Sequence, residues 1–181
     1  MKNTILASLA LLLGFAVNAQ TPATDVVTLN VNLSPIQSIT VNTSQKTVNL
    51  DYVTADDYSN GVTLAQANHL EVYSTGGFQV SVKSAGTELT NGSEVNGNIA
   101  ASDIKITATD GTAAIDAAAY KPTVSLSAEN QAILSTTKGA VNKNVNITYG
   151  AAGGDAYVDK YIAGQNPTTY TTQLTYTITA Q

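Results

Sequence analysis

The sequence predicts an all-β protein, an antiparallel immunoglobulin-like β-sandwich of about eight to ten short strands. Apolar residues recur at every second position in many short runs, which is the period of a half-buried strand. Turn-forming residues separate these runs at short intervals. No segment after the N-terminal leader shows a long helical period, so the strands are expected to pack against each other.

The chain begins with the pattern of a secretory signal peptide. Lys2 precedes an apolar run, residues 5–17, which is too short to span a bilayer as a helix. Small residues follow, and we predict cleavage after Ala19, which leaves residues 20–181 as a single β-sandwich domain. A membrane anchor is the alternative interpretation of the run. We expect no transmembrane segment in the mature chain and a secreted protein, located in the periplasm or at the cell surface.

The expected strands follow from the alternation. Their apolar positions, in chain order, are Val27, Leu29, Val31 and Leu33; Ile39 and Val41; Val48, Leu50 and Tyr52; Leu70 and Val72; Phe78, Val80 and Val82; Ile104, Ile106 and Ala108; Val124 and Leu126; Val145, Ile147 and Tyr149; Tyr170, Leu174, Tyr176 and Ile178.

Turns and loops separate these strands. The turn at residues 74–77 contains two glycines and predicts a β-hairpin between its flanking strands. Short helical turns are candidates at residues 113–120 and 157–162. Residues 84–100 and 150–168 are rich in turn-forming residues, and we expect them to form two long loops.

The charge and composition exclude several classes of partner and chemistry. The chain has a net charge of −5, no cysteine and no arginine. Without a basic patch it has no means of neutralising phosphates, so we expect no nucleic-acid partner. Without cysteine it must fold with no disulfide, although secretion would permit one.

No catalytic arrangement emerges from the residues, and we expect the protein not to be an enzyme. His69 is the only histidine, and its interpretations are a general base, a metal ligand or a polar residue at a strand edge. No cysteine or second histidine is available to join it in a zinc site, and no serine elbow motif is present. Unpaired carboxylates leave a glycosidase as the remaining enzymatic alternative.

Carboxylates offer one candidate cofactor, calcium; otherwise we expect none. Asp51, Asp56 and Asp57 form one cluster, and Asp155 and Asp159 lie in the second long loop. Calcium binds carboxylate and carbonyl oxygens, so either group is a candidate contributor. The alternative is that these charges are simply solvated.

Tyrosine is the dominant aromatic residue, with nine against two phenylalanines and no tryptophan. Tyr58, Tyr120, Tyr157 and Tyr161 are expected in loops. Because tyrosine supplies rigid, amphipathic contact area, these four form a candidate binding surface for a saccharide or a protein. Packing that anchors the loops is the alternative.

Three segments together resemble a known family. They are residues 47–52, residues 70–82 and residues 167–178, and their order resembles the WxL-domain surface proteins of bacteria. More loosely, it resembles the β-sandwich of spore coat protein U and fimbrial subunits. Where WxL proteins have Trp-x-Leu, this chain has Phe78-Gln79-Val80 and Tyr176-Thr177-Ile178, which keep an aromatic-x-aliphatic form.

The resemblance implies an extracytoplasmic protein that attaches non-covalently to the cell wall or assembles with partners. We expect a non-catalytic structural protein of the cell envelope or surface, and an assembling, pilus-like subunit is one form of it. In that form, residues 26–33 would pair with the sheet edge of another copy by strand addition. The alternative is a peptidoglycan- or glycan-binding module. The expected partners are thus an envelope protein, a polysaccharide or the protein itself.

Overall fold

A computed structural model describes residues 22–93 and 95–181 of the chain. It divides into two compact units, Met1–Leu33 and Ser34–Gln181. The predicted signal peptide, residues 1–19, lies outside the described residues and stays a prediction. In the first unit, residues 22–33 form neither helix nor strand.

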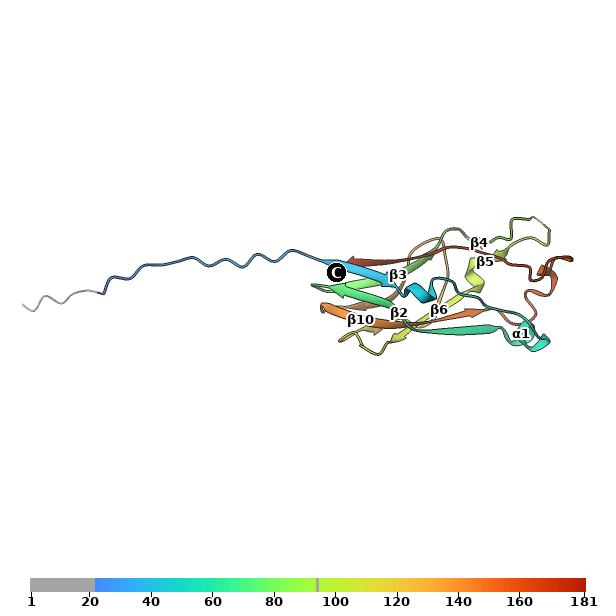
Figure 1. Cartoon of the computed structure of the whole chain (residues 1–181), viewed down its shortest axis with the longest axis horizontal. Helices are drawn as coiled ribbons and strands as arrows, with labels where there is room; N and C mark the ends of the chain where they lie inside the picture. Colours follow the sequence, from blue (N-terminus) through green and yellow to red (C-terminus); the bar gives the residue numbers. More distant parts are fainter. Residues whose placement is uncertain (1–21, 94) are drawn as a thin grey trace, which may run out of the picture. The chain divides into compact units, whose positions relative to one another are not determined.

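The second unit is built almost entirely of β-strands (Figure 1). Strands make up 42% of the structure and helices 9%, so the predicted all-β class is confirmed. The described elements are β1 (Gln37–Val41), η1 (Thr43–Gln45), α1 (Ala55–Asn60), β2 (Val62–Ser74), β3 (Phe78–Ser84), β4 (Glu88–Leu89), β5 (Ile99–Ala100), η2 (Ala101–Asp103), β6 (Lys105–Asp110), β7 (Ala119–Tyr120), β8 (Val124–Ser125), β9 (Gln131–Thr136), β10 (Ala140–Ala151), η3 (Val158–Lys160) and β11 (Leu174–Ala180).

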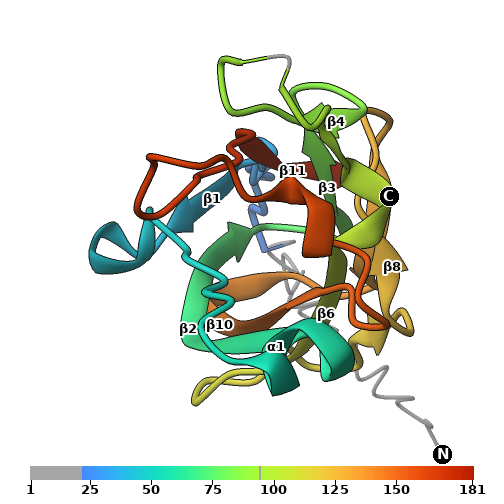
Figure 2. The same cartoon turned by 90° about the vertical axis from the view of Figure 1, so that its right-hand side faces the viewer.

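Two antiparallel sheets hold most of these strands (Figure 2). The first has the order β1-β2-β10-β6-β8, and the second has the order β11-β3-β9-β7; β4 and β5 form a separate pair. Alternate apolar side chains from both large sheets enter one hydrophobic core, in which Phe78, Val80, Ile106 and Ile147 are fully buried. This alternation fixes the register, because a slip of one residue would expose every one of them.

The first sheet is irregular in the middle of its longest pairing. Val145 lies opposite Leu70 and Ile147 opposite Gln66, so three residues of β2 face the single residue Asn146 of β10. Asn68 takes a positive φ of 50° there, and its amide N–H donates to Asn146 Oδ1 at 2.7 Å. Such a bulge bends the strand and ends regular pairing. The edge strand β1 pairs with β2 only on the far side of the bulge, from Leu70 to Ser74.

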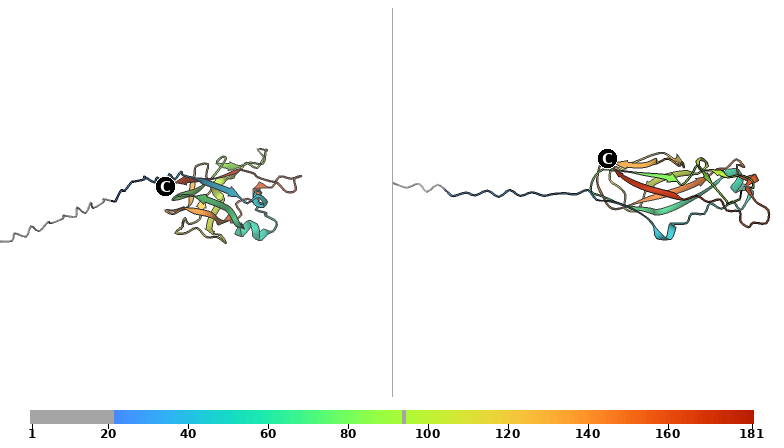
Figure 3. Two further views of the ribbon diagram at one scale, coloured as in Figure 1. Left: turned by 60° about the vertical axis from the view of Figure 1, so that its left-hand side comes forward. Right: turned by 90° about the horizontal axis from the view of Figure 1, so that it is seen from above.

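β1 and β11 are the end strands of the two sheets on the same side of the unit (Figures 1 and 3). Leu174 lies opposite Ser84 and Ala180 opposite Phe78. Among the strands that the structure describes, β1 pairs only with β2 and β11 only with β3. Each therefore presents one unpaired edge.

Two strand predictions differ from the structure because alternation does not guarantee a partner. Residues 26–33 form no strand, and their apolar side chains are exposed. Residues 48–52 keep the predicted alternation, with Val48, Leu50 and Tyr52 turned inward, but they pair with no strand within residues 22–93 and 95–181. Conversely, alternation does not predict β9, because its apolar residues Ile133 and Leu134 are adjacent in the sequence.

The predicted hairpin at residues 74–77 is wrong. β2 belongs to the first sheet and β3 to the second, so this turn carries the chain between sheets. The helical turn expected at residues 113–120 is absent, whereas residues 157–162 contain the short helix η3. The helix α1 was missed. Its signal is a capping box, in which the Thr54 side chain accepts from the Asp57 amide and the Asp57 carboxylate accepts from the Thr54 amide.

Candidate functional site

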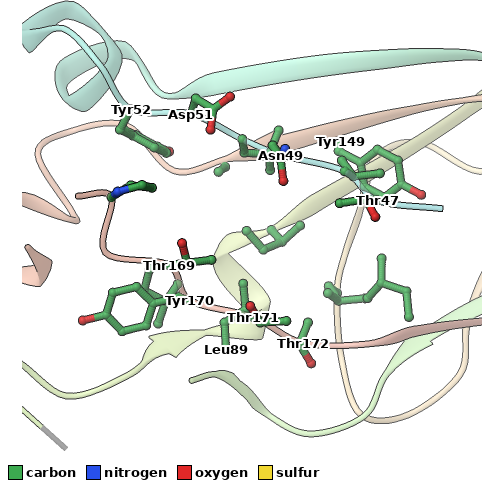
Figure 4. Close-up of a pocket in the computed structure, with 18 of the residues that line it drawn as sticks. Thr47, Asn49, Asp51, Tyr52, Leu89, Tyr149, Thr169, Tyr170, Thr171 and Thr172 are labelled. Carbon is green, nitrogen blue, oxygen red and sulfur yellow. The ribbon is translucent and has the colours of Figure 1, made fainter. Parts of the chain in front are cut away.

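A groove of about 1260 Å³ lies in the second unit between two stretches of chain that belong to no sheet. One wall is residues 46–53, which we call the N-wall. The other is residues 166–173, which we call the C-wall and which leads into β11. Figure 4 shows Thr47, Asn49 and Asp51 along the N-wall, facing Thr169 to Thr172 of the C-wall.

The N-wall begins where the edge strand leaves the sheet. The Asn42 amide donates to His69 O at 2.8 Å, which is the last backbone bond between this stretch and β2. The next fixed point is the Val53 amide, which donates to Asp57 Oδ2 at 2.9 Å. Among the described residues, the main chain of residues 46–52 has no hydrogen-bond partner. Its donors and acceptors are therefore available to a partner or to water.

The N-wall is nevertheless held in place by its side chains. Val48 and Leu50 pack against the hydrophobic core, and the Tyr52 hydroxyl donates to Ala152 O at 2.6 Å. Thr47, Asn49 and Asp51 point outward and are exposed. The wall is thus a strand in its side-chain pattern, but not in its hydrogen bonding.

The C-wall presents alternate backbone groups to the groove. Thr171 exchanges both of its backbone bonds with Thr90, at 3.1 and 2.8 Å, and Gln173 O accepts from the Ala85 amide at 2.8 Å. Both partners lie on the side away from the N-wall. Since successive residues of a strand point their N–H and C=O groups to opposite sides, Tyr170 and Thr172 direct theirs toward the groove. Neither has a backbone partner among the described residues.

A chain of buried hydrogen bonds lies beneath the groove. His69 is only 2% exposed; its Nδ1 lies 3.0 Å from Gln45 Oε1 and its Nε2 lies 2.8 Å from the Tyr149 hydroxyl. The Tyr149 hydroxyl lies 2.6 Å from that of Tyr176. Gln45 Nε2 donates to Ala67 O, which leaves Oε1 as the acceptor. His69 therefore donates from Nδ1 and accepts at Nε2.

Burial keeps the titratable groups of this hydrogen-bonded series in their neutral forms. It lowers the pKa of His69, which keeps the imidazole neutral at pH 7. It also raises the pKa of Tyr149 to about 12 and raises the pKa of Tyr176 further. The groups consequently satisfy each other as neutral partners. His69 connects η1, β2 and β10, so its position is that of a structural residue.

The four tyrosines predicted as one binding surface are distributed over the unit. Tyr58 lies in α1 and Tyr120 in β7, not in loops. Tyr157 is 6% exposed; the rings of Tyr58 and Tyr157 each lie 5.2 Å from that of Tyr52. Tyr58, Tyr157 and Tyr161 line the groove, and Tyr161 is 54% exposed.

Tyr120 lies elsewhere, and its hydroxyl donates to Asp110 Oδ1 at 2.8 Å. Burial, with this hydrogen bond and the charge of Asp110, raises the pKa of Tyr120. The structure thus brings three of the four predicted tyrosines to one groove and leaves the fourth outside it.

The two aromatic-x-aliphatic positions lie on neighbouring strands. Ile178 of β11 is opposite Val80 of β3, and Tyr176 and Phe78 lie further along the same pair. Phe78 and Val80 are fully buried, so their side chains are core residues and do not reach a ligand. Tyr176 and Ile178 pack against the same core.

The predicted carboxylate clusters do not form a recognisable metal site in the part of the chain that the structure describes. No three histidine, aspartate or glutamate side chains are close enough there to hold an ion. Asp57 is used for capping: its Oδ2 accepts from the amides of Val53 and Thr54, which lowers the pKa of its carboxyl.

No protein-family model matches this sequence, and no curated protein matches it either. Within residues 22–93 and 95–181, the helices are too short or too polar to cross a bilayer.

The groove itself could not be predicted from the sequence. The alternation predicts a strand at residues 48–52 and the turn-forming residues predict a long loop at residues 150–168, but alternation indicates only which side chains turn inward. The absence of a main-chain partner, which opens the groove, leaves no signal in the side-chain pattern.

Proposed function

We propose that the protein is a non-catalytic structural subunit of an extracytoplasmic surface assembly, in which residues 26–33 of one copy add as a strand to another copy. The fold proposed for the subunit is an immunoglobulin-like β-sandwich that lacks one edge strand. The shared core of the two sheets and their unpaired edges support that fold. The neutral, buried His69 supports a non-catalytic role.

The observation that carries this proposal is the exposure of the N-terminal segment. Val27, Leu29, Val31 and Leu33 alternate with polar residues, and their side chains are 77–89% exposed. Burying one such side chain contributes roughly 1.5–3 kcal/mol. An amphipathic strand with its apolar face in water therefore gains several kilocalories per mole by pairing, which offsets the cost of association.

Light scattering coupled to size-exclusion chromatography tests the proposal on the mature chain. We expect oligomers that grow with protein concentration, and monomers for the variant Leu29→Asn/Val31→Asn. The matched control is Asn30→Ser/Asn32→Ser, which alters the polar face of the same segment and should assemble as the parent does. A parent chain that stays monomeric at every concentration would refute strand addition.

The second proposal is a glycan-binding module attached non-covalently to the cell wall. The exposed Tyr161 and the polar residues Thr47, Asn49 and Thr169 at the groove support it. The burial of Tyr157 and the hydrogen bond of Tyr52 to Ala152 leave little aromatic face for a sugar ring. Retention on insoluble cell wall, lost in Tyr161→Ala, would favour this function; no retention at low salt would eliminate it.

A further inference from the structure

We infer that the groove between the N-wall and the C-wall is the acceptor site for residues 26–33 of a second copy of this chain. The inference rests on the proposed function and adds where the segment binds and in which direction it runs. Three features of the groove and one of the linker before β1 support it.

The first feature is the backbone chemistry of the walls. Tyr170 and Thr172 direct their N–H and C=O groups into the groove, and residues 46–52 have no backbone partner among the described residues. A strand placed between the walls would find donors and acceptors on both sides. The other two end strands, β7 and β8, are only two residues long, so they offer much less edge for pairing.

The second feature is the match between side chains. Among the apolar residues that line the groove are Leu50 of the N-wall, Leu89 of β4 and Leu174 of β11, all of them half-buried. They would contact the apolar face of the added segment. The outward residues of the walls are polar, among them Asn49 and Thr171, as are Thr28, Asn30 and Asn32 on the opposite face of the segment. An added strand would therefore continue both the apolar inner face and the polar outer face of the two walls.

The third feature is size. At about 1260 Å³, the groove exceeds the roughly 300–1,000 Å³ that is typical of a small-molecule site. It lies along two extended stretches of chain (Figure 4). These dimensions suit a peptide segment better than a compact ligand.

The fourth feature is the short linker between the segment and β1, which favours a second copy as the source. Three residue steps, at most ~11 Å when extended, separate Leu33 from Ile36. The backbone of Ile36 is held beside β2, because the Thr75 amide donates to Ile36 O and the Ile36 amide donates to Thr75 Oγ1, each at 3.0 Å. The groove begins at Val41, the far end of β1, and includes no earlier residue of that strand. The five steps from Ile36 to Val41 rise about 16 Å, so a chain's own Leu33 does not reach its groove, whereas the segment of another molecule can.

The walls determine the direction of the added strand. They run in opposite directions, from Thr47 to Tyr52 on one side and from Thr169 to Thr172 on the other (Figure 4). An added strand is antiparallel to one and parallel to the other. We assign it antiparallel to the C-wall and β11, because that edge already has regular strand geometry and antiparallel pairing is the more stable kind.

Disulfide trapping tests the site, and the chain is suited to it because it contains no cysteine. The donor is the mature chain with Asn30→Cys. It is mixed with acceptor chains that carry Thr171→Cys, Gln173→Cys or Thr175→Cys, all at exposed outward positions. Cross-strand neighbours lie within disulfide distance. The matched control acceptor is Thr123→Cys, which is exposed beside the opposite end strand, β8.

We expect at least one of the three groove acceptors to form a mixed dimer, at a yield several-fold above that of Thr123→Cys. Moving the donor cysteine from Asn30 to Asn32 should shift the best acceptor two residues toward the N-terminus, because the strands are antiparallel. A shift toward the C-terminus would overturn the assigned direction.

The remaining outcomes separate the site from the function. Oligomers with no more trapping at the groove than at Thr123 would overturn the acceptor site and leave strand addition standing elsewhere. Trapping within a single chain that carries both cysteines would overturn the second copy as the source. Absence of both oligomers and trapping would refute the proposed function together with the site.

Discussion

The hydroxyl of Tyr149 on β10 lies 2.6 Å from the hydroxyl of Tyr176 on β11, and this hydrogen bond joins the two sheets below the groove. Tyr149 also donates to His69, which in turn donates to Gln45 beside the N-wall. One buried chain of polar groups therefore connects the first sheet, the second sheet and the start of the N-wall. We therefore expect these hydrogen bonds to stabilise the side of the second unit that contains the groove.

Removing hydroxyls from this chain should have unequal effects on stability. Tyr149→Phe leaves both His69 Nε2 and the Tyr176 hydroxyl without a partner, and we expect it to lower the free energy of unfolding by about 2–4 kcal/mol. Tyr176→Phe removes a donor but leaves Tyr149 bonded to His69, so about 1 kcal/mol is expected. Urea unfolding measures both, with the exposed Tyr161→Phe as a control that should change nothing. An equal decrease in the free energy of unfolding for the two variants would contradict this order of donors and acceptors.

His69 should make stability depend on pH between about 5 and 7. Burial lowers its pKa in the folded state below its usual value of 6.5. As the pH falls below 6.5, His69 is protonated in the unfolded state more readily than in the folded state. The free energy of unfolding therefore decreases. The slope should approach, at most, about 1.4 kcal/mol per pH unit.

Unfolding curves at several pH values check this dependence, with His69→Gln as the comparison. The substitution should flatten the profile between pH 5 and 7. The loss at lower pH, where Asp57 and other carboxyls protonate, should remain. A slope unchanged by the substitution would assign the dependence to another group.

The capping box of α1 should control the order of the N-wall. Thr54→Ala removes the side chain that accepts from the Asp57 amide, and loss of such a cap costs about 1 kcal/mol. Because Asp57 in turn accepts from the Val53 amide, we expect faster hydrogen exchange at residues 53–60 in the variant. Thr54→Ser, which keeps the hydroxyl, should behave like the parent protein.

Amide exchange along the C-wall should alternate. The Thr171 amide donates to Thr90 O and should exchange slowly, whereas those of Tyr170 and Thr172 face the groove and should exchange quickly in the monomer. On assembly, residues 170 and 172 should become protected by roughly tenfold or more. Residue-resolved exchange measured by NMR in the monomeric variant and by mass spectrometry in the assembly checks both states. Unchanged exchange at residues 170 and 172 would count against occupation of the groove.

Much of the fold was predictable because burial imposes the alternation. The period of two predicted β1, β3, β6 and β11, and the parts of β2 and β10 around Leu70 and Ile147, but it left out the first half of β2, which also alternates and pairs with β10. The turn at residues 74–77 was not correctly predicted as a hairpin, because Gly76 and Gly77 permit a tight reversal whether the next strand joins the same sheet or the other one. The sequence therefore indicates a tight turn at residues 74–77, but not which sheet the next strand joins.

The site was less predictable for the same reason. The alternation of residues 27–33 and of residues 48–52 is equivalent in kind to that of β11, yet neither segment has a strand partner in the structure. Which strands pair depends on events remote in sequence, such as the bulge at Asn68 that parts β1 from the first half of β2. The residues of a segment do not by themselves indicate whether that segment will lack a strand partner.

The groove lies on the side of the second unit where β1 and β11 end the two sheets, whereas the end strands β7 and β8 are only two residues long. If residues 26–33 of one copy occupy this groove of another, each molecule has one donor segment and one acceptor groove. Each copy would then join one predecessor and one successor, without branching. Such head-to-tail contacts are heterologous, so repeated addition yields either a closed ring or an open helical fibre, according to the rotation between neighbours. The fibre would be polar, ending in an empty groove at one extremity and a bare hydrophobic tail at the other.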